Sequence, residues 1–287
     1  MDNIIKGWFS EINEFWPGQA LSIELDGPVL YHEKSDFQDI LIFKSKAFGN
    51  VLVLDGAIQI TEKDEIAYQE QIAHIPLFTH PNPKKVLVVG GGDGGVIREV
   101  AKHDCVEEIH LCEIDQKVIE ASKKFLPKIA VGFNDPRVRV HIEDGAEFVK
   151  KYKNEFDVVI TDSSDPSGPA SQLFGEEYFK VVKEALTDNG VLITQAECIW
   201  LHVDLIVSMK KFISKIFPSV TYATSQIPTY PNGSLGFFLA TKNGTVFPTE
   251  PVREVTAEFQ AKLNYYTPKM HNAAFTLPAF AERILNF

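Results

Sequence analysis

The stretch Lys84-Lys85-Val86-Leu87-Val88-Val89-Gly90-Gly91-Gly92-Asp93-Gly94-Gly95 decides the fold of this chain. Its apolar half predicts a buried strand, and its glycines predict a loop leading from that strand into a helix. Such a Gly-x-Gly-x-x-Gly loop lets backbone N–H groups approach a nucleotide-like ligand, and the helix N-terminus prefers an anion. Asp93 reverses that preference locally, because its carboxylate repels a pyrophosphate or an amino-acid carboxylate and attracts an amine. We therefore expect a ligand that is nucleoside-like at one end and cationic at the other.

Beyond this loop, strand and helix patterns alternate along the chain. Near-continuous apolar runs predict strands at 86–89, 109–112, 138–142, 156–161 and 191–194, with helices between them such as 116–126 and 176–186. This alternation predicts an α/β fold, a doubly wound and mostly parallel sheet with helices on both faces. Runs 219–226 and 235–241 predict an antiparallel hairpin at the sheet edge, a feature of methyltransferase-like sheets rather than dehydrogenase sheets.

The first part of the chain has a different pattern. Extended runs at 20–25, 37–43 and 50–54, punctuated by Asp26-Gly27-Pro28 and Asp55-Gly56, predict a small antiparallel sheet. Thr61 and Asp64 then predict the start of a helix over 61–77, with an apolar stripe at Ile66, Ile72 and Leu77. We expect an N-terminal antiparallel β domain over residues 1–65 and a Rossmann-like catalytic domain over residues 66–287.

Composition excludes several classes of protein. The formal net charge of −11 argues against non-specific nucleic-acid binding and favours cationic small-molecule partners. No apolar run reaches the roughly 20 residues of a membrane-spanning helix. Cys105, Cys112 and Cys198 are odd in number and lack Cys-x-x-Cys spacing, and the histidines form no ligand pair, so neither a disulfide framework nor a metal site is expected. We expect a soluble, cytoplasmic enzyme or binding protein.

Acidic residues follow four predicted parallel strands in succession. They are Asp93 after the first strand, Glu113 and Asp115 after the second, Glu143 and Asp144 after the third, and Asp162 and Asp165 after the fourth. Each could simply cap the next helix. Ligands of doubly wound sheets bind beyond the carboxyl ends of the strands. Acids at four successive strand ends therefore favour one shared site for a cationic ligand.

Individual acids suggest individual contacts. Glu113 lies 20 residues after Asp93, where a carboxylate can accept hydrogen bonds from ribose hydroxyls, but this does not separate NAD from an adenosyl ligand. Asp144, followed by Gly145, could accept a hydrogen bond from an exocyclic amine such as adenine N6, or it could be the N-cap of the next helix. Asp162-Ser163-Ser164-Asp165, followed by Pro and Gly, describes an acidic loop able to fold over a cation, unless it is an ordinary charged surface loop.

Several longer motifs resemble those of the polyamine aminopropyltransferases, and the match runs from end to end. They are Gly7-Trp8-Phe9, Trp16-Pro17-Gly18-Gln19, Tyr68-Gln69-Glu70, Gly90 to Gly95, Asp162 to Pro169, Ile227-Pro228-Thr229-Tyr230-Pro231 and Ala273-Ala274-Phe275-Thr276-Leu277-Pro278. The resemblance implies a methyltransferase-like domain behind an N-terminal β domain, usually as a homodimer. It also implies transfer of the aminopropyl group of decarboxylated S-adenosylmethionine to putrescine, giving spermidine and methylthioadenosine, without a metal or redox cofactor.

The same resemblance implies roles for individual residues. The aminopropyl donor would be held by Gln38, Gly90, Gly92, Asp93, Glu113, Asp144 and Gly145. The diamine would be held by Trp16, Tyr68, Gln69, Asp93, Asp162, Ser163, Asp165, Gln195 and Tyr230. Asp162, assisted by Tyr68, would deprotonate the reacting amine, and the loop from Ser163 to Glu176 would gate the pocket.

Other functions fit parts of the pattern. An amine N-methyltransferase would use the same scaffold, a nicotinamide dehydrogenase would use the glycine loop, and a polyamine-binding regulator would use the acidic pocket without turnover. Asp93 argues against a nearby pyrophosphate and against the carboxylate of ordinary S-adenosylmethionine. The sequence leaves open how well cadaverine or spermidine replaces putrescine.

Overall fold

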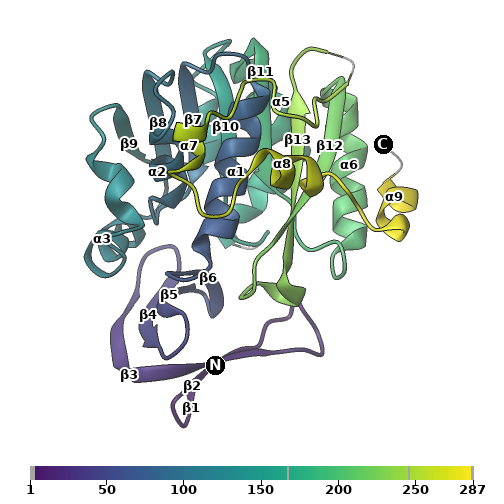
Figure 1. Ribbon diagram of the computed structural model, residues 1–287. Helices are drawn as coiled ribbons and strands as arrows, with labels where there is room; N and C mark the ends of the chain where they lie inside the picture. Colours follow the sequence, from purple (N-terminus) through teal and green to yellow (C-terminus); the bar gives the residue numbers. More distant parts are fainter. Residues whose placement is uncertain (1–3, 167, 245, 286–287) are drawn as a thin grey trace.

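The computed structural model describes residues 4–166, 168–244 and 246–285. It contains a small antiparallel sheet below a larger layered α/β unit (Figure 1). The small sheet has the strand order β1-β2-β3-β4-β5-β6. Its strands are β1 (Ile4–Ile5), β2 (Trp8–Glu11), β3 (Leu21–Lys34), β4 (Asp39–Ser45), β5 (Gly49–Leu54) and β6 (Ala57–Thr61).

The larger sheet has the order β12-β13-β11-β10-β7-β8-β9, in which β9, β8, β7, β10 and β11 run parallel. Strands β12 and β13 pair antiparallel at the other edge, as the sequence predicts. The strands are β7 (Lys85–Gly90), β8 (Glu108–Glu113), β9 (Val138–Ile142), β10 (Phe156–Asp162), β11 (Leu186–Gln195), β12 (Ser219–Gln226) and β13 (Ser234–Thr241).

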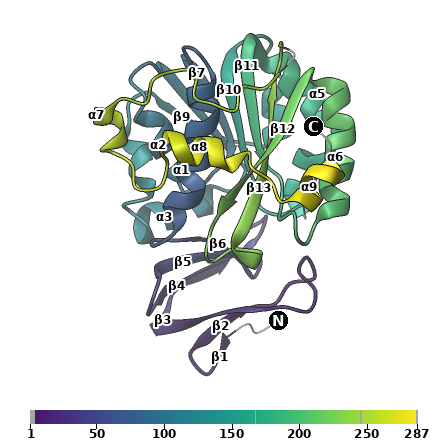
Figure 2. The same ribbon diagram turned by 45° about the vertical axis from the view of Figure 1, so that its right-hand side comes forward.

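Helices cover both faces of the larger sheet because its strands are apolar on both sides. Val86 and Val88 of β7 face one core with α1 and α2, whereas Leu87 and Val89 face a second core with α4, α5 and α6. The helices are α1 (Glu65–Thr79), α2 (Gly95–Ala101), α3 (Gln116–Phe125), α4 (Gly145–Val149), α5 (Glu176–Ala185), α6 (Val203–Ile216), α7 (Ala257–Gln260), α8 (Pro268–Ala274) and α9 (Ala279–Leu285). Figure 2 shows α8 and α9 on the outside of this unit. None of the described helices is long and apolar enough to cross a membrane.

The predicted turn at Asp26-Gly27-Pro28 is wrong. Strand β3 continues through it for 14 residues, and the pairing with β4 shifts register between Leu25 and Val29 and again before Tyr31. An irregular pairing of β3 with β4 accommodates Gly27 and Pro28 within the strand, although these residue types often mark a turn. The second predicted turn is present: Asp55 and Gly56 both have positive φ between the paired residues Leu54 and Ala57.

The long helix α1 differs from expectation at its start and in its burial. Thr61 ends β6, and its hydroxyl donates a hydrogen bond of 2.6 Å to Asp64, the residue before the first helical turn. All residues of the helix except Ile66 are buried, so no single apolar stripe forms. A helix enclosed by the sheet, α2 and the C-terminal segment needs no polar face. This enclosure fixes the direction of the side chains that α1 sends to the site.

Candidate active site

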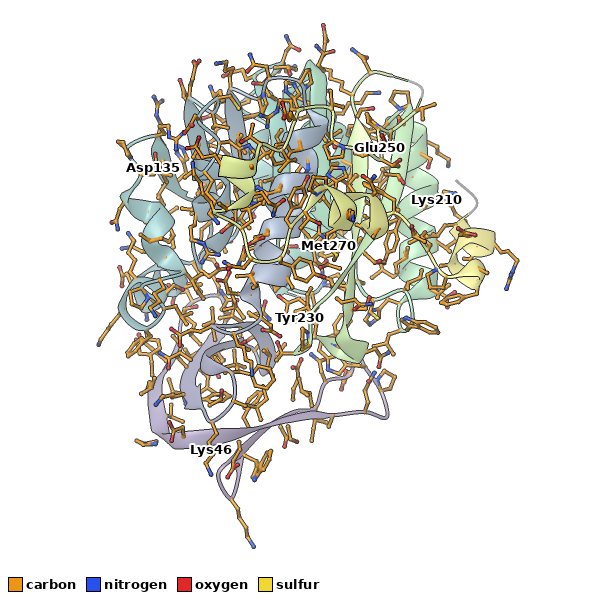
Figure 3. All side chains as sticks on the ribbon, viewed as in Figure 1. Lys46, Asp135, Lys210, Tyr230, Glu250 and Met270 are labelled. Atoms are coloured by element: carbon orange, nitrogen blue, oxygen red, sulfur yellow. The ribbon has the colours of Figure 1, made fainter. Side chains whose placement is uncertain are left out.

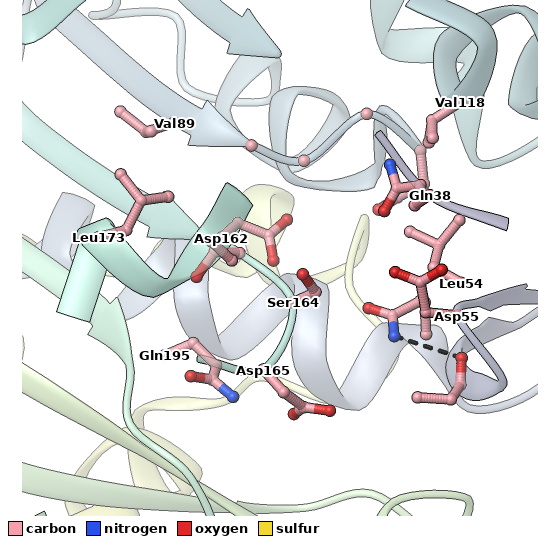
Figure 4. A pocket seen from close by; sticks show the side chains of 18 of the residues that line it. Gln38, Leu54, Asp55, Val89, Val118, Asp162, Ser164, Asp165, Leu173 and Gln195 are labelled. Carbon is pink, nitrogen blue, oxygen red and sulfur yellow. Dashed lines mark hydrogen bonds between the residues drawn. The ribbon is translucent and has the colours of Figure 1, made fainter. Parts of the chain in front are cut away.

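One pocket lies beyond the carboxyl ends of β7, β8, β10 and β11, where the small sheet meets the larger unit. Figure 4 shows Asp162, Asp165 and Gln195 around one space, with Gln38 and Leu54 on another side. Every residue that the sequence assigned to a ligand lines this pocket: Trp16, Gln38, Tyr68, Gln69, Gly90, Gly92, Asp93, Glu113, Asp144, Gly145, Asp162, Ser163, Asp165, Gln195 and Tyr230. The predicted clustering is present, although the role of each residue stays a prediction.

Two of the acids at the strand ends do not line the pocket. Asp115 caps α3 by accepting from the backbone N–H of Lys117 at 3.0 Å, and it also accepts from Ser35 and Gln38. Glu143 pairs with Lys151 on the surface. The capping interpretation is therefore right for Asp115, and the shared-site interpretation fits only the remaining five acids.

The glycine loop brings β7 against the end of β10. Gly90 has φ +81°, and a Cβ atom built on it would lie 2.0 Å from the carbonyl oxygen of Asp162. The backbone N–H of Gly91 donates to that same oxygen at 3.0 Å. Only glycine permits this approach at position 90. It places the carboxylate of Asp162 beside the glycine loop.

Asp93 stands at the N-terminus of α2. Its Oδ1 accepts from the backbone N–H of Gly95 at 2.7 Å and from Nε2 of Gln69 at 3.0 Å. Burial raises the pKa of Asp93, and these donors together with the charge of Arg98 partly offset that effect. The helix N-terminus is thus already occupied by a carboxylate of the protein, which disfavours a second anion there.

Asp162 is a strongly perturbed carboxyl group of the pocket. Burial, together with the charge of Asp93, raises its pKa to about 8, and the hydrogen bond from Tyr68 opposes the shift. The Tyr68 hydroxyl donates to Oδ1 at 2.6 Å, while Oδ2 is buried and has no hydrogen-bond partner in the part of the chain that the structure describes. A carboxyl group with one oriented oxygen, one free oxygen and a pKa near neutrality suits a general base.

Further along the pocket, Asp165 and Gln195 are joined by Glu197, which the sequence interpretation missed. Burial raises the pKa of both acids to about 7, and the charge of Glu197 adds to the shift of Asp165. Glu197 adopts φ +61°, an uncommon value for a residue other than glycine. Its position just beyond the end of β11 extends the series of acids at strand ends to a fifth strand, so the same rule could have found it.

Several pocket residues hold buried polar atoms without a hydrogen-bond partner among the described residues. They are Oε1 of Gln69, Oδ2 of Asp162, Oγ of Ser163, Oε1 of Gln195 and Nδ1 of His202. Buried polar groups are normally paired, and leaving one unpaired costs about 1 to 3 kcal/mol. Four of these five atoms are oxygens that can accept from an ammonium group. The pocket is therefore built to receive hydrogen-bond donors.

Two protein-family models match this chain. The family model of the spermine/spermidine synthase domain matches residues 65–250, and the family model of the spermidine synthase tetramerisation domain matches residues 7–62. The chain belongs to the spermine/spermidine synthase family. It is 56% identical to the spermidine synthase of Dictyostelium discoideum over the whole length of both chains. It is 53% identical to that of Schizosaccharomyces pombe, covering 99% of this chain and 95% of the relative.

Solved structures of the family confirm the α/β fold class. A spermidine synthase in complex with the transition-state analogue AdoDATO superposes with a TM-score of 0.90 at 40% identity, covering 97% of this chain and 94% of that one. The spermidine synthase of Thermotoga maritima superposes with a TM-score of 0.89 at the same identity and coverage. The family is one of transferases, so the enzyme class predicted from the sequence is confirmed as well.

In this member of the family, the pocket also carries the residues expected to hold a nucleoside. Burial raises the pKa of Glu113 to about 7, and its Oε1 accepts from the backbone N–H of Asp115 at 2.9 Å. Asp144 caps α4 by accepting from the backbone N–H of Glu147 at 3.0 Å, and its second oxygen accepts from Gln172. The capping and ligand-binding interpretations of Asp144 are thus compatible, since it also lines the pocket.

The aromatic wall of the pocket joins the two sheets. The Tyr230 hydroxyl donates to the carbonyl oxygen of Gln59 in β6 at 2.6 Å, and Figure 3 shows Tyr230 between the larger unit and the small sheet. The Tyr230 and Tyr68 rings lie 5.9 Å apart between centroids. Trp16 reaches the pocket from the loop between β2 and β3 and is 5% exposed. Flat rings of this kind suit a methylene chain or an ammonium group.

Proposed function

We propose that this chain transfers the aminopropyl group of decarboxylated S-adenosylmethionine to putrescine, producing spermidine and methylthioadenosine. The family and its full-length spermidine synthase relatives support this reaction. A family structure in complex with a transition-state analogue supports small-molecule substrates. The observation that carries the proposal is Asp162. Tyr68 holds one of its oxygens, the other has no hydrogen-bond partner among the described residues, and further carboxyl groups line the same pocket.

The chemistry is a displacement at carbon. The lone pair of a putrescine nitrogen forms a bond to the aminopropyl carbon beside the sulfonium, and the carbon–sulfur bond breaks with its electrons going to sulfur. The nitrogen must first lose a proton, because an alkyl ammonium with a pKa of about 10.4 is almost wholly protonated at neutral pH. Asp162 takes that proton through its free Oδ2, and Tyr68 keeps the carboxyl group oriented. The sulfonium of the donor assists, since a nearby cation lowers the pKa of the amine.

Three carboxyl groups of the pocket would bind the aminopropyl donor. Glu113 accepts from the ribose hydroxyls, Asp144 accepts from the adenine amine, and Asp93 faces the donor's own ammonium. Ordinary S-adenosylmethionine carries a carboxylate next to that ammonium, and Asp93 repels it. Gln38 completes this end from the small sheet, and Gly90, Gly92 and Gly145 leave room for the nucleoside. No metal or redox cofactor takes part in the proposed reaction.

An amine N-methyltransferase is the alternative, and the comparisons do not favour it, because the named relatives are spermidine synthases. The two functions separate in one experiment. The enzyme is incubated with putrescine and either sulfonium donor, and the amines and nucleosides are analysed by mass spectrometry. Spermidine and methylthioadenosine from the decarboxylated donor support the proposal. A methylated amine from ordinary S-adenosylmethionine, or bound amine without any turnover, would overturn it.

The proposal extends to assembly and compartment. The match of residues 7–62 to a tetramerisation domain supports an oligomer, and we propose a homodimer as its basic unit. Light scattering on the purified chain separates dimer from tetramer. Cys105, Cys112 and Cys198 are free thiols, which supports the cytoplasm as the compartment, to be tested by imaging a tagged chain.

A further inference from the structure

The loop over residues 12–20 reaches the pocket with little support of its own. It connects β2 to β3 and contains no helix or strand. Its internal hydrogen bonds run from the backbone N–H groups of Phe15 and Trp16 to Asn13. Yet Trp16 in this loop is almost fully buried and lines the pocket. Something outside the loop must therefore hold Trp16 in place.

His202 supplies that support. Its Nε2 lies 2.8 Å from the carbonyl oxygen of Phe15, and because a carbonyl only accepts, Nε2 carries the proton. Among the hydrogen bonds of the described residues, this one alone joins residues 12–20 to the larger unit. The His202 ring also packs against Trp16, with 6.2 Å between ring centroids, and against Phe15 at 6.3 Å.

The second ring nitrogen of His202 lies beside Glu197, one of the acids of the pocket. Nδ1 of His202 lies 3.3 Å from Oε2 of Glu197 and makes no hydrogen bond to any described residue, and both residues line the pocket. His202 thus stands between the loop that carries Trp16 and the strand end that carries Glu197, and it touches both.

We propose that His202 is a positioning residue for the amine acceptor, tethering the 12–20 loop through Phe15 so that Trp16 closes the pocket beside Glu197. The inference rests on the proposed aminopropyl transfer. It predicts that loss of the tether weakens binding of putrescine, while the donor, which lies at the Glu113 and Asp144 end, binds as before. The chemical step at Asp162 is affected less than acceptor binding, because Tyr68 and not His202 orients that carboxyl group.

Three substitutions separate the two ring nitrogens. His202→Gln places an amide N–H near the position of Nε2 and can keep the tether, whereas His202→Asn places its amide near Nδ1 and cannot reach Phe15. His202→Phe keeps the ring and loses both nitrogens. A net hydrogen bond corresponds to a change of about 3- to 10-fold in affinity. We expect KM for putrescine to rise by about that factor in the Asn and Phe variants and to stay near the wild-type value in the Gln variant.

The matched control is His271→Gln. His271 is a fully buried histidine bonded to the Tyr266 hydroxyl through Nδ1 at 2.7 Å, and it does not line the pocket. Calorimetric binding of methylthioadenosine checks that every variant is folded with an intact donor end. If the Phe variant does not fold, the Asn and Gln pair still decides the question.

Steady-state kinetics with both substrates varied gives the result. A selective rise in KM for putrescine in the Asn variant, reversed in the Gln variant, supports the tether. Equal KM values in all variants, or a rise in KM for the donor of the same size, overturns it. If the wild-type enzyme transfers no aminopropyl group at all, the proposed function fails instead, so the two failures are distinguishable.

Discussion

Replacing Asp162 by Asn tests the proposed base directly. The amide oxygen can still accept the hydrogen bond of the Tyr68 hydroxyl, so the side chain keeps its orientation while the free oxygen is replaced by a group that cannot take a proton. Because the change preserves volume and one contact, the pocket should remain assembled. Any loss of rate then reports on proton transfer.

The magnitude follows from the pKa of the two partners. A carboxyl group at the ordinary value of 3.8 would lie about 6 to 7 pKa units below an alkyl ammonium, whereas Asp162, with its pKa raised to about 8, lies only about 2 to 3 units below it. At about 1.36 kcal/mol per unit, burial of Asp162 and the nearby charge of Asp93 thus remove several kcal/mol from an otherwise uphill transfer. General bases contribute about 100- to 10,000-fold. We expect kcat of the Asn variant to fall by that factor.

The assay is release of methylthioadenosine at saturating donor and varied putrescine, repeated at several pH values between 6 and 9.5. Asp162 must be ionised to act, so kcat/KM of the wild type should rise with pH through about 8, and the Asn variant should lose this limb. Asp165→Asn, in the same loop, is the matched control and should raise KM for putrescine more than it lowers kcat. Turnover of the Asp162 variant within about tenfold of the wild type, with the same pH profile, would refute the reasoning.

Three further outcomes follow from single contacts. Asp93→Asn should weaken discrimination against ordinary S-adenosylmethionine, seen as a smaller ratio of the inhibition constant of that compound to KM of the donor; an unchanged ratio would exclude Asp93 as its cause. Gly90→Ala should abolish donor binding or destabilise the fold, because its Cβ would meet the Asp162 carbonyl, and calorimetry with methylthioadenosine together with thermal melting distinguishes these results. Burial alone would raise the pKa of Glu99, but hydrogen bonding to His74 and nearby cations outweigh it and lower the pKa to about 2. The free energy of unfolding that ionised Glu99 contributes is therefore present above pH 4.5 and lost as pH falls towards 2. Glu99→Gln should lower the free energy of unfolding, measured with urea at pH 7, by about 3 to 5 kcal/mol and should remove its decrease between pH 4.5 and 2. An unaltered dependence of stability on pH would contradict this.

The sequence predicted the larger sheet and the pocket because strong local signals coincide there. Apolar runs fix the parallel strands, and topology alone brings the carboxyl ends of β7, β8, β9 and β10 to one rim, so Asp93, Glu113, Asp144 and Asp162 had to meet. The same rule included Asp115 and Glu143 wrongly, because strand-end position does not reveal whether a carboxylate turns inwards or towards the surface.

What the sequence missed depends on long-range contacts. Glycine and proline at 27 and 28 lie inside β3 because pairing with β4 on the far side of the irregularity outweighs the local turn preference. His202 lies 187 residues from Phe15 in sequence, and nothing in the local pattern links the two. Such contacts between a loop and the start of a distant helix are set by how the small sheet docks on the larger unit.

The charge balance of the pocket leads to one last prediction. Burial raises the pKa of Asp162 to about 8 and those of Glu113, Asp165 and Glu197 to about 7, so some of these groups carry protons at pH 7. A bound ammonium lowers the pKa of nearby carboxyl groups and favours their ionised forms.

Binding of putrescine to the complex with methylthioadenosine, which cannot react, should therefore release protons at pH 7. Binding of the uncharged methylthioadenosine alone should release far fewer. Calorimetry in two buffers of different ionisation enthalpy measures the number of protons exchanged, and Asp165→Asn should reduce it. Proton uptake, or equal exchange for the charged and uncharged ligands, would mean that the pocket carboxyl groups are already ionised before the amine arrives, and that the raised pKa proposed for the base is wrong.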